Sequence, residues 1–359
     1  MAEISIIKYN KNFKEDMINF LGLHWKSLQN QESIRELFEW KYEKNPYGKF
    51  PVNYLAADGK KIVGHVGFYL QKYKLRNHTY TFAIAADAHV HPEYRRRGIF
   101  SDIINYSTGD ILKRGDIDLI IHVTYNNKSA PCVMKSGYYA IDTRKKMYLF
   151  SVLNLLKKYI LSEKKLFPIN TKSADLKIEI TDKLRAQEIS EFNGILTKDD
   201  KINNIRDTAF YKWRYSHPLE KYIIAYCKKN EDKLVGYIIF KKHSKKSYSI
   251  MEYGYTEQTY FKKLFKEVSK KLSISFLQTN TFSRPKTEIS LLKSLGFKNQ
   301  KQIAGGLLYA LGYIQEDKLP GMLISPTSTK IKDDNFILDE IDIRDKENWS
   351  IFESDLIWF

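Results

Sequence analysis

Three consecutive arginines and a glycine, residues 95–98, stand between two apolar stretches of this 359-residue chain. Residues 79–90 read as a strand, and the apolar spacing of residues 101–115 predicts a helix. A helix N-terminus presents unpaired N–H groups and positive partial charge, which together favour phosphate. Gly98 has no Cβ, so the backbone can approach a ligand closely. The turn therefore predicts a pyrophosphate site, and the alternative is a solvated basic turn.

The elements around this turn carry a family resemblance. The next predicted strand, residues 117–125, would lie parallel to the first, with the helix as a right-handed crossover. In that setting Arg95-x-x-Gly98-x-Phe100 resembles the acyl-CoA motif of the GNAT acyltransferases. The stretch after the second strand resembles the second motif of the same family, at Asn126, Ser129, Gly137 and Tyr138.

The resemblance implies that acetyl-CoA or another short acyl-CoA is the co-substrate. The N–H groups of residues 96–100 would hold the pyrophosphate, the strand end at 88–90 would pair with the pantetheine arm, and Asn126 would bond that arm. The implied CoA-binding residues are Ala88, Val90, Arg95, Arg96, Arg97, Gly98, Ile99, Phe100, Asn126 and Ser129.

The chain departs from the family pattern where the proton-transfer groups are expected. Val133 takes the position of the family's tyrosine acid, and Ile84 and Ala86 take the positions of its base. Asp87 and His89 are nearby, but strict strand alternation turns them to the other, partly exposed face. His89 is nevertheless kept as a candidate catalytic residue.

An internal repeat predicts a duplicated domain. Trp40, Tyr42 and Pro46 precede a predicted hairpin around Asp58-Gly59, and Trp213, Tyr215 and Pro218 precede a second strand pair. Each copy ends in a helix, a glycine and a strand. The second copy passes from strand to helix over residues 249–265 without an Arg-x-x-Gly turn.

These observations predict an α/β protein of two tandem GNAT domains. Each would have a mixed, mostly antiparallel central sheet flanked by helices, with a V-shaped splay between two parallel strands in the first. We expect an acyl-CoA-binding domain at 1–150, a linker at 151–180 and a degenerate domain at 181–330. The degenerate domain would lack the CoA-binding turn, called here the CoA cradle, and would form the acceptor side. An acidic tail at 331–359 would pack back on the two domains.

Composition limits the partners. The formal net charge of +17 suits an anionic ligand, although lysines spread over solvated faces are the alternative. No apolar run approaches the roughly 20 residues of a membrane span. Cys132 and Cys227 give neither a disulfide framework nor a metal spacing, so we expect a cytoplasmic protein without metal.

The acceptor follows from the same resemblance. Tandem GNAT proteins with one silent half include aminoglycoside acetyltransferases and nucleotide-sugar N-acyltransferases, and this chain is more similar to the sugar enzymes. That implies transfer to the amine of an amino-sugar nucleotide such as dTDP-3-amino-3,6-dideoxyhexose, for surface polysaccharide synthesis. Candidate acceptor-binding residues are Trp40, Lys41, Tyr42, Arg214 and Tyr215, and for the tryptophans a core role is favoured.

The C-terminal tail supplies further catalytic candidates. By similarity to the aminoglycoside enzymes, the α-carboxylate of Phe359 or the side chain of Asp355 would receive or hold the amine's proton, whereas a strand capping the second sheet is the alternative. Two other functions stay open: a FemAB-like aminoacyl-tRNA-dependent transferase, which the intact CoA turn disfavours, and an acyl-CoA sensor without turnover. No nucleic-acid partner is expected, and the sequence leaves the oligomeric state open.

Overall fold

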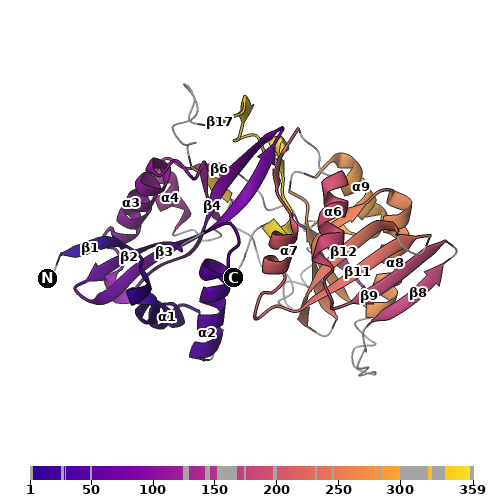
Figure 1. The fold of residues 1–359 in the computed structure, drawn as a ribbon, viewed down its shortest axis with the longest axis horizontal. Coiled ribbons are helices and arrows are strands. Elements are labelled where there is room, and N and C mark those ends of the chain that lie inside the picture. Colours follow the sequence, from indigo (N-terminus) through magenta and orange to yellow (C-terminus); the bar gives the residue numbers. More distant parts are fainter. Residues whose placement is uncertain are drawn as a thin grey trace.

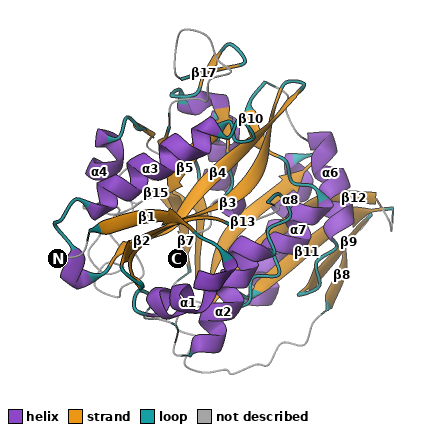
Figure 2. Cartoon of the chain, turned by 60° about the vertical axis from the view of Figure 1, so that its left-hand side comes forward, coloured by secondary structure: helices purple, strands orange, loops and turns teal. Residues whose placement is uncertain are grey.

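Two α/β halves lie side by side in the computed structural model, the first on the left and the second on the right of Figure 1. Each half has a central mixed sheet with helices packed against it, as Figure 2 shows from another side. The expected α/β class is therefore confirmed. The structure describes residues 3–25, 28, 30–48, 51–123, 129–141, 146–151, 168–173, 175–196, 200–230, 233–244, 246–282, 284–299, 322–325 and 336–355.

The first sheet has the strand order β1-β2-β3-β4-β5-β16-β6, and β10 and β19 extend it beside β3. Only the β4–β5 and β10–β19 pairs are parallel among its described strands. Its members are β1 (Ile4–Lys8), β2 (Val52–Asp58), β3 (Lys61–Leu75), β4 (His78–Val90), β5 (Leu119–Val123), β6 (Tyr139–Ile141), β10 (Ile202–Asn204), β16 (Met322–Ile324) and β19 (Trp349–Ser350).

The second sheet has the order β15-β7-β14-β13-β12-β11-β9-β8, with β13–β14 as its parallel pair. Its members are β7 (Lys146–Phe150), β8 (Ile169–Ser173), β9 (Leu176–Thr181), β11 (Tyr222–Lys229), β12 (Lys233–Ser244), β13 (Ser247–Tyr255), β14 (Phe276–Asn280) and β15 (Lys298–Asn299). A separate small hairpin pairs β17 (Ile337–Leu338) with β18 (Ile341–Asp342).

The helices pack on opposite faces of each sheet. In the first half α1 and α2 cover one face and α3 and α4 the other, and in the second half α6 and α7 lie opposite α8 and α9. Their bounds are α1 (Lys14–Gly22), α2 (Gln31–Phe38), α3 (Ile99–Lys113), α4 (Ala130–Lys135), α6 (Ala186–Leu196), α7 (Thr208–Arg214), α8 (Gln258–Leu272) and α9 (Lys286–Ser294).

Local sequence signals account for the elements around the arginine turn. The Asp58-Gly59 hairpin joins β2 to β3, with Gly59 at φ +60°, and β4, α3 and β5 form where strand, helix and parallel strand were predicted. The range predicted as a linker, 151–180, includes β8 and β9, because alternate apolar residues of 176–180 are buried in the second sheet. Its basic stretch, residues 152–167, lies outside the described residues.

Each half supplies strands to the sheet of the other, and β10 of the second half pairs with β3 of the first sheet. The strand β7, from the first half of the sequence, lies between β14 and β15 of the second sheet. Conversely β16, from the end of the second half, lies between β5 and β6 of the first. Sheet membership therefore does not follow the predicted limits 1–150 and 181–330, and neither sheet is complete without the other half.

The apolar core has a central part that both halves share. The α1–α2 face of the first sheet and the α6–α7 face of the second contribute to one continuous cluster of buried side chains. The α3–α4 face and the α8–α9 face each have a separate outer cluster. The helices of the shared cluster thus meet in the middle of the molecule, between the two sheets.

Two tryptophans join the halves at this centre. The indole N–H of Trp40 donates to the Trp213 carbonyl at 2.7 Å, and the indole N–H of Trp213 donates to the Trp40 carbonyl at 2.8 Å. Their rings stack with centroids 5.3 Å apart and planes 14° apart, and both side chains are buried. The repeated Trp-x-Tyr sequence therefore forms a local two-fold contact, as expected of core anchors.

The described part of the C-terminal tail, residues 336–355, lies against both halves. Trp349 is fully buried beside Tyr73 and Phe82 of the first sheet, and β19 pairs with β10. Phe352 packs under the guanidinium of Arg284, whose carbon lies 3.5 Å from the ring centroid. The tail thus closes the outer edge of the contact between the halves.

The tryptophan contact makes a stability prediction. Trp40→Ala and Trp213→Ala should each lower the free energy of unfolding by about 3–5 kcal/mol. The double variant should cost less than the sum by about 0.5–3 kcal/mol, because each single variant already removes the shared contact. Urea unfolding measures all three.

A matched pair tests the coupling. Phe297 lies in the outer core of the second half, so Trp40→Ala combined with Phe297→Ala should be additive. Additive costs for the two tryptophans would contradict a coupled contact.

Candidate functional site

The arginine turn forms an exposed loop at the start of α3. After β4 ends at Val90, a 3₁₀ turn (Pro92–Tyr94) leads to Arg96 and Gly98, both with left-handed backbone at φ +65° and +81°. The side chains of residues 95–98 are exposed. Among the described residues, the first bond across the α3 N-terminus is from the Asp102 N–H to the Gly98 carbonyl at 3.1 Å. The N–H groups in the first turn of a helix have no intrahelical partner, so this end of α3 is one where an anion can bind.

Neighbouring side chains fix the shape of the loop. The Tyr94 hydroxyl donates to Asp58 at 2.8 Å, and the guanidinium of Arg97 lies 4.9 Å from the Tyr94 ring centroid. The Arg95 Nε donates to the Val90 carbonyl at 3.2 Å. A Cβ at Gly98 would point into a largely open space, with the Asp102 carboxylate nearest at 3.6 Å. An open, N–H-lined turn of this kind fits a pyrophosphate.

The strands beside the turn separate as the fold class requires. The parallel pairing of β4 and β5 runs from Phe82–Leu119 to Ala85–His122, and β4 then continues to Val90 paired with β3 but not with β5. Ala88 and Val90 face the α3 side of the sheet. Ile99 is buried and Phe100 half-buried at the start of α3, and Ser129 is half-buried directly before α4. Asn126 lies outside the described residues.

A bulge in β4 changes the facing of the residues near the splay. His65 pairs with His89 but Gly67 pairs with Ala86, so β4 holds one extra residue, and Asp87 has φ +53°. Asp87 and His89 consequently face the α1–α2 layer, as Ile84 and Ala86 do. The expectation that alternation turns them to another, partly exposed face was wrong, because the bulge shifts the alternation by one residue.

Asp87 is the acceptor in a buried polar cluster. Its carboxylate accepts from the Lys41 Nζ at 2.7 Å, the Tyr42 hydroxyl at 2.6 Å and the Trp25 indole at 3.2 Å. The side chain of Lys41 is fully buried and that of Asp87 is 4% exposed. Burial lowers the pKa of Lys41, whereas for Asp87 the effect of burial is outweighed by Lys41 and Tyr42, which lower the pKa of the carboxyl. The Asp87 carboxyl is therefore ionised at neutral pH.

His89 lies next to this cluster. Its ring stacks on His24 of the segment after α1, with centroids 4.3 Å apart and planes 2° apart. Burial lowers the pKa of His89, and the nearby Asp87 carboxylate only partly offsets this. The half-buried imidazole is thus a neutral base near the splay and on the face shared with the second half.

The second half repeats the buried carboxylate but not the turn. Glu252, on the bulged β13, accepts from the hydroxyls of Tyr215 at 2.9 Å, Tyr211 at 2.6 Å and Tyr237 at 2.8 Å. Tyr215 corresponds to Tyr42 in the sequence repeat. Only two residues join β13 to α8, however, and the second is Glu257, whose acidic side chain stands where an anion would bind.

Most of the predicted acceptor-binding side chains are buried and contact other residues of the protein. Trp40, Lys41, Tyr42 and Arg214 are buried. The Arg214 guanidinium donates to the Tyr222 hydroxyl at 2.7 Å and to the Ser354 carbonyl at 3.0 Å. Tyr215 is half-buried and reaches a surface groove.

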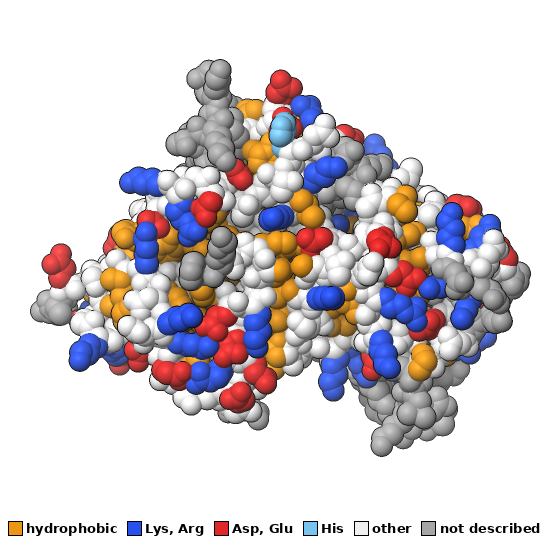
Figure 3. All heavy atoms as spheres, in the orientation of Figure 1, with side chains coloured by type: hydrophobic (Ala, Val, Ile, Leu, Met, Phe, Trp, Pro, Cys, Tyr) orange, Lys and Arg blue, Asp and Glu red, His pale blue; other side chains and the backbone are white. Residues whose placement is uncertain are grey.

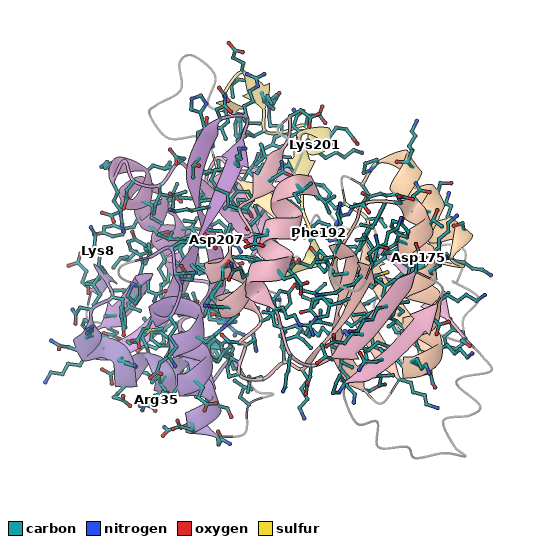
Figure 4. All side chains as sticks on the ribbon, turned by 45° about the vertical axis from the view of Figure 1, so that its right-hand side comes forward. Lys8, Arg35, Asp175, Phe192, Lys201 and Asp207 are labelled. Carbon is teal, nitrogen blue, oxygen red and sulfur yellow. The ribbon has the colours of Figure 1, made fainter. Side chains whose placement is uncertain are left out.

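That groove lies between α6 and α7 of the second half. Its volume is about 800 Å³, and its lining includes Lys212, Thr208 and Ser216 beside Tyr215. Figure 4 shows Phe192 on α6 and, between the two halves, Asp207, which caps α7 and accepts from the Tyr47 hydroxyl at 2.8 Å. The groove is therefore next to the contact between the halves.

The predicted tail residues are placed only in part. Asp355 is fully buried and forms an ion pair with Arg206, beside Glu252 of the second half. Burial raises the pKa of the Asp355 carboxyl, although Arg206 opposes this. Its carboxylate also accepts from the Phe352 N–H at 2.7 Å, so its described partners are structural. Phe359 lies outside the described residues.

Sequence reasoning missed the partners of the candidate base. The sequence did not predict the contact of Asp87 with Lys41 or that of His89 with His24. The repeated Trp-basic-Tyr pattern was nevertheless a signal that residues 40–42 have a fixed position. Among the described residues no group of three or more His, Cys, Asp or Glu side chains is arranged to hold a metal ion. No helix in the described part of the chain has the length and apolarity that a membrane crossing requires.

Comparison with known proteins agrees with this geometry. Residues 5–125 match the model of the acetyltransferase (GNAT) domain, a segment that includes β4, the arginine turn and α3. No curated protein matches the sequence.

Solved structures show the same overall fold. A conserved protein from Enterococcus faecalis V583, described as a probable N-acyltransferase, has a TM-score of 0.61 at 14% identity, covering 90% of this chain and 72% of that one. A GCN5-related N-acetyltransferase from Anabaena variabilis ATCC 29413 has a TM-score of 0.58 at 13% identity with the same coverage. A tandem GNAT protein from the clavulanic acid pathway has a TM-score of 0.52 at 11% identity, covering 83% of this chain and 95% of that one.

The family match covers the half with the exposed turn and the splayed strands, and the structural similarity extends over both halves. The chain therefore carries a GNAT acetyltransferase domain in its first half, within the fold of tandem GNAT proteins.

Proposed function

We propose that this protein transfers an acetyl or short hydroxyacyl group from acyl-CoA to the amine of an amino-sugar nucleotide, such as a dTDP-3-amino-3,6-dideoxyhexose, in the cytoplasm. The turn at 95–98 carries the acyl-CoA part of the proposal, because it joins the unpaired end of the β4–β5 splay to the N-terminus of α3. Its N–H groups would hold the pyrophosphate, while the β4 edge at Ala88–Val90 pairs with the pantetheine arm.

The two halves would divide the work. A two-residue turn ending in Glu257 takes the place of the cradle in the second half, which supports binding of acyl-CoA by the first half alone. The second half would then complete the acceptor side, since its α6–α7 layer packs against the α1–α2 layer of the first. This division is the proposed role of the tandem arrangement.

His89 is the proposed general base. The amine nitrogen attacks the thioester carbonyl carbon, the C–S bond breaks, and the proton of the amine passes to the neutral imidazole. The departing thiolate takes up a proton from solvent. The backbone N–H of Val90, just after the β4 bulge, would stabilise the developing oxyanion. Asp87 is bound to Lys41, so its carboxylate would act on His89 through its negative charge rather than take the proton itself.

The acceptor class rests on the resemblance and on the groove between α6 and α7. An amino-sugar nucleotide brings an anionic diphosphate and an aromatic base. The groove offers the cationic Arg185 and Lys212, two hydroxyl side chains and the Tyr215 ring, with the acidic Glu188 and Glu191 on its α6 side. Surface polysaccharide synthesis is the proposed setting for such an acceptor.

The two alternative functions make different demands. A tRNA-dependent transferase needs a continuous basic surface, whereas on the face in Figure 3 Lys and Arg side chains are interspersed with Asp and Glu. A sensor needs no base on the acceptor side, whereas His89 is a neutral imidazole there. Both observations favour acyl transfer.

The cradle assignment predicts a loss of binding. Gly98→Val should abolish acetyl-CoA binding in calorimetry, because a branched side chain would stand in the path of the pyrophosphate. Gly137→Val is the matched control, since Gly137 also has positive φ, at +90°, and no neighbour within 4 Å of its Cβ position. A folded Gly98→Val protein with unchanged affinity would mean that the arginines are merely solvated.

The base assignment predicts a pH profile. Because the pKa of His89 lies below its ordinary value of 6.5, the acid limb of kcat/KM should lie below pH 6.5, where the ring becomes protonated. His89→Gln should lower kcat/KM by about 100- to 10,000-fold and leave acetyl-CoA affinity unchanged.

His78→Gln is the control for the base, because His78 is an exposed histidine at the tip of the β3–β4 hairpin. It should leave the profile unaltered. The same acid limb in the residual activity of His89→Gln would belong to the acceptor amine and would exclude His89 as the base.

A thiol-release assay tests the acceptor. Free CoA should appear when acetyl-CoA is mixed with dTDP-amino sugars, and aminoglycosides or simple amines should react more slowly. Release of CoA with aminoglycosides alone would identify aminoglycosides as the acceptor class. No release with any amine would favour an acyl-CoA sensor without turnover.

A further inference from the structure

The strand β5 carries a histidine at the point where the two parallel strands part. His122 forms the last parallel pair with Ala85, and β4 beyond that pair has no further pairing with β5. On its other side His122 pairs with Leu323 of the exchanged strand β16. The residue is therefore fixed by backbone pairing on both sides, at the inner end of the splay.

The side chain of His122 is buried in apolar surroundings. It is 4% exposed, and its ring meets those of Phe68 and Tyr138 edge to face, at centroid distances of 5.9 Å and 4.9 Å. The Nε2 atom has no hydrogen-bond partner in the described part of the structure. A buried polar nitrogen without a partner is costly, and its presence where the β4–β5 pairing ends points to a ligand.

The cluster around His122 lacks a polar group that the family pattern has. Val133, at the position of the family's tyrosine acid, belongs to the same buried cluster as the rings around His122. Where it pairs with β5, the neighbouring strand β4 presents Ala83 and Ala85 on this face. His122 is thus the polar side chain that this part of the cluster offers to the inner end of the splay.

We propose that Nε2 of His122 forms a hydrogen bond with the thioester end of bound acyl-CoA and positions it in the splay. This inference rests on the proposed function, since the pantetheine arm must enter along β4. Two groups of the ligand have the required chemistry, the acyl carbonyl and the adjoining pantetheine amide. His122 is a positioning residue under this proposal, and not the acid that protonates the thiolate.

The charge state of the ring fits a positioning contact. Burial lowers the pKa of His122 to about 3, so the imidazole is neutral at neutral pH and offers one donor and one acceptor nitrogen. A neutral ring holds a polar group without bringing an unpaired charge into the cluster.

Calorimetry with ligands of decreasing size tests the proposal. His122→Phe keeps an aromatic ring but removes the nitrogens, and should weaken acetyl-CoA binding about three- to tenfold. Adenosine 3′,5′-bisphosphate contains the nucleotide without the pantetheine arm, so its affinity should not change. His122→Gln places an amide nitrogen near the Nε2 position and should restore most of the acetyl-CoA affinity.

A residue of the other half provides the matched control. Thr279 forms the last parallel pair of β13 and β14 and is 3% exposed, so it occupies the corresponding position in the second half. Thr279→Val should leave the affinity for every ligand unchanged. Unliganded His122→Phe should melt at or above the wild-type temperature, because the unpartnered nitrogen is gone.

The ligand series also identifies the group that is bound. Equal weakening for CoA and acetyl-CoA would assign the contact to the pantetheine amide, and weakening for acetyl-CoA alone would assign it to the acyl carbonyl. Unchanged acetyl-CoA affinity in folded His122→Phe would overturn the proposal, and so would equal loss for the bisphosphate. Wild-type protein that does not bind acetyl-CoA would refute the proposed function itself.

Discussion

The reciprocal contact of Trp40 and Trp213 sets the geometry on which the rest of the molecule depends. Each indole satisfies the main-chain carbonyl of the other, so neither buried carbonyl is left without a donor when the halves are together. The stacked rings are part of the core that the inner helical layers of both halves share. Because Lys41 and Tyr42 follow Trp40 directly, this contact also places the donors that hold Asp87.

Both halves keep a carboxylate on a bulged central strand and bind it with the tyrosine of the repeated motif. In the first half the remaining partners are a lysine and a tryptophan, and in the second they are two further tyrosines, with Arg206 nearby. A buried carboxylate requires such donors, because an unpaired one would be far too costly. The halves differ instead at the turn after this strand, which is long, basic and open in one and short and acidic in the other.

Sequence patterns predicted the elements whose signals are local. The Asp58-Gly59 hairpin, the strand before the arginine turn and the helix after it follow from turn chemistry and periodicity. The facing of Asp87 and His89 was not predictable, because one inserted residue reverses alternation and leaves no mark in composition. The burial of Lys41 and Arg214 likewise depends on distant partners, namely Asp87 and the tail at Ser354.

The exchanged strands limit how far the chain can fold while it is being synthesised. The first sheet lacks its strand β16 until residues 322–324 have been made, so the N-terminal half leaves the ribosome with β5 and β6 still unjoined. For most of translation this half exposes two strand edges that invite pairing with other chains. Contacts between residues about 200 positions apart, such as His122 with Leu323, also slow folding. The first sheet of this protein therefore reaches its final form only after residues 322–324 have been made.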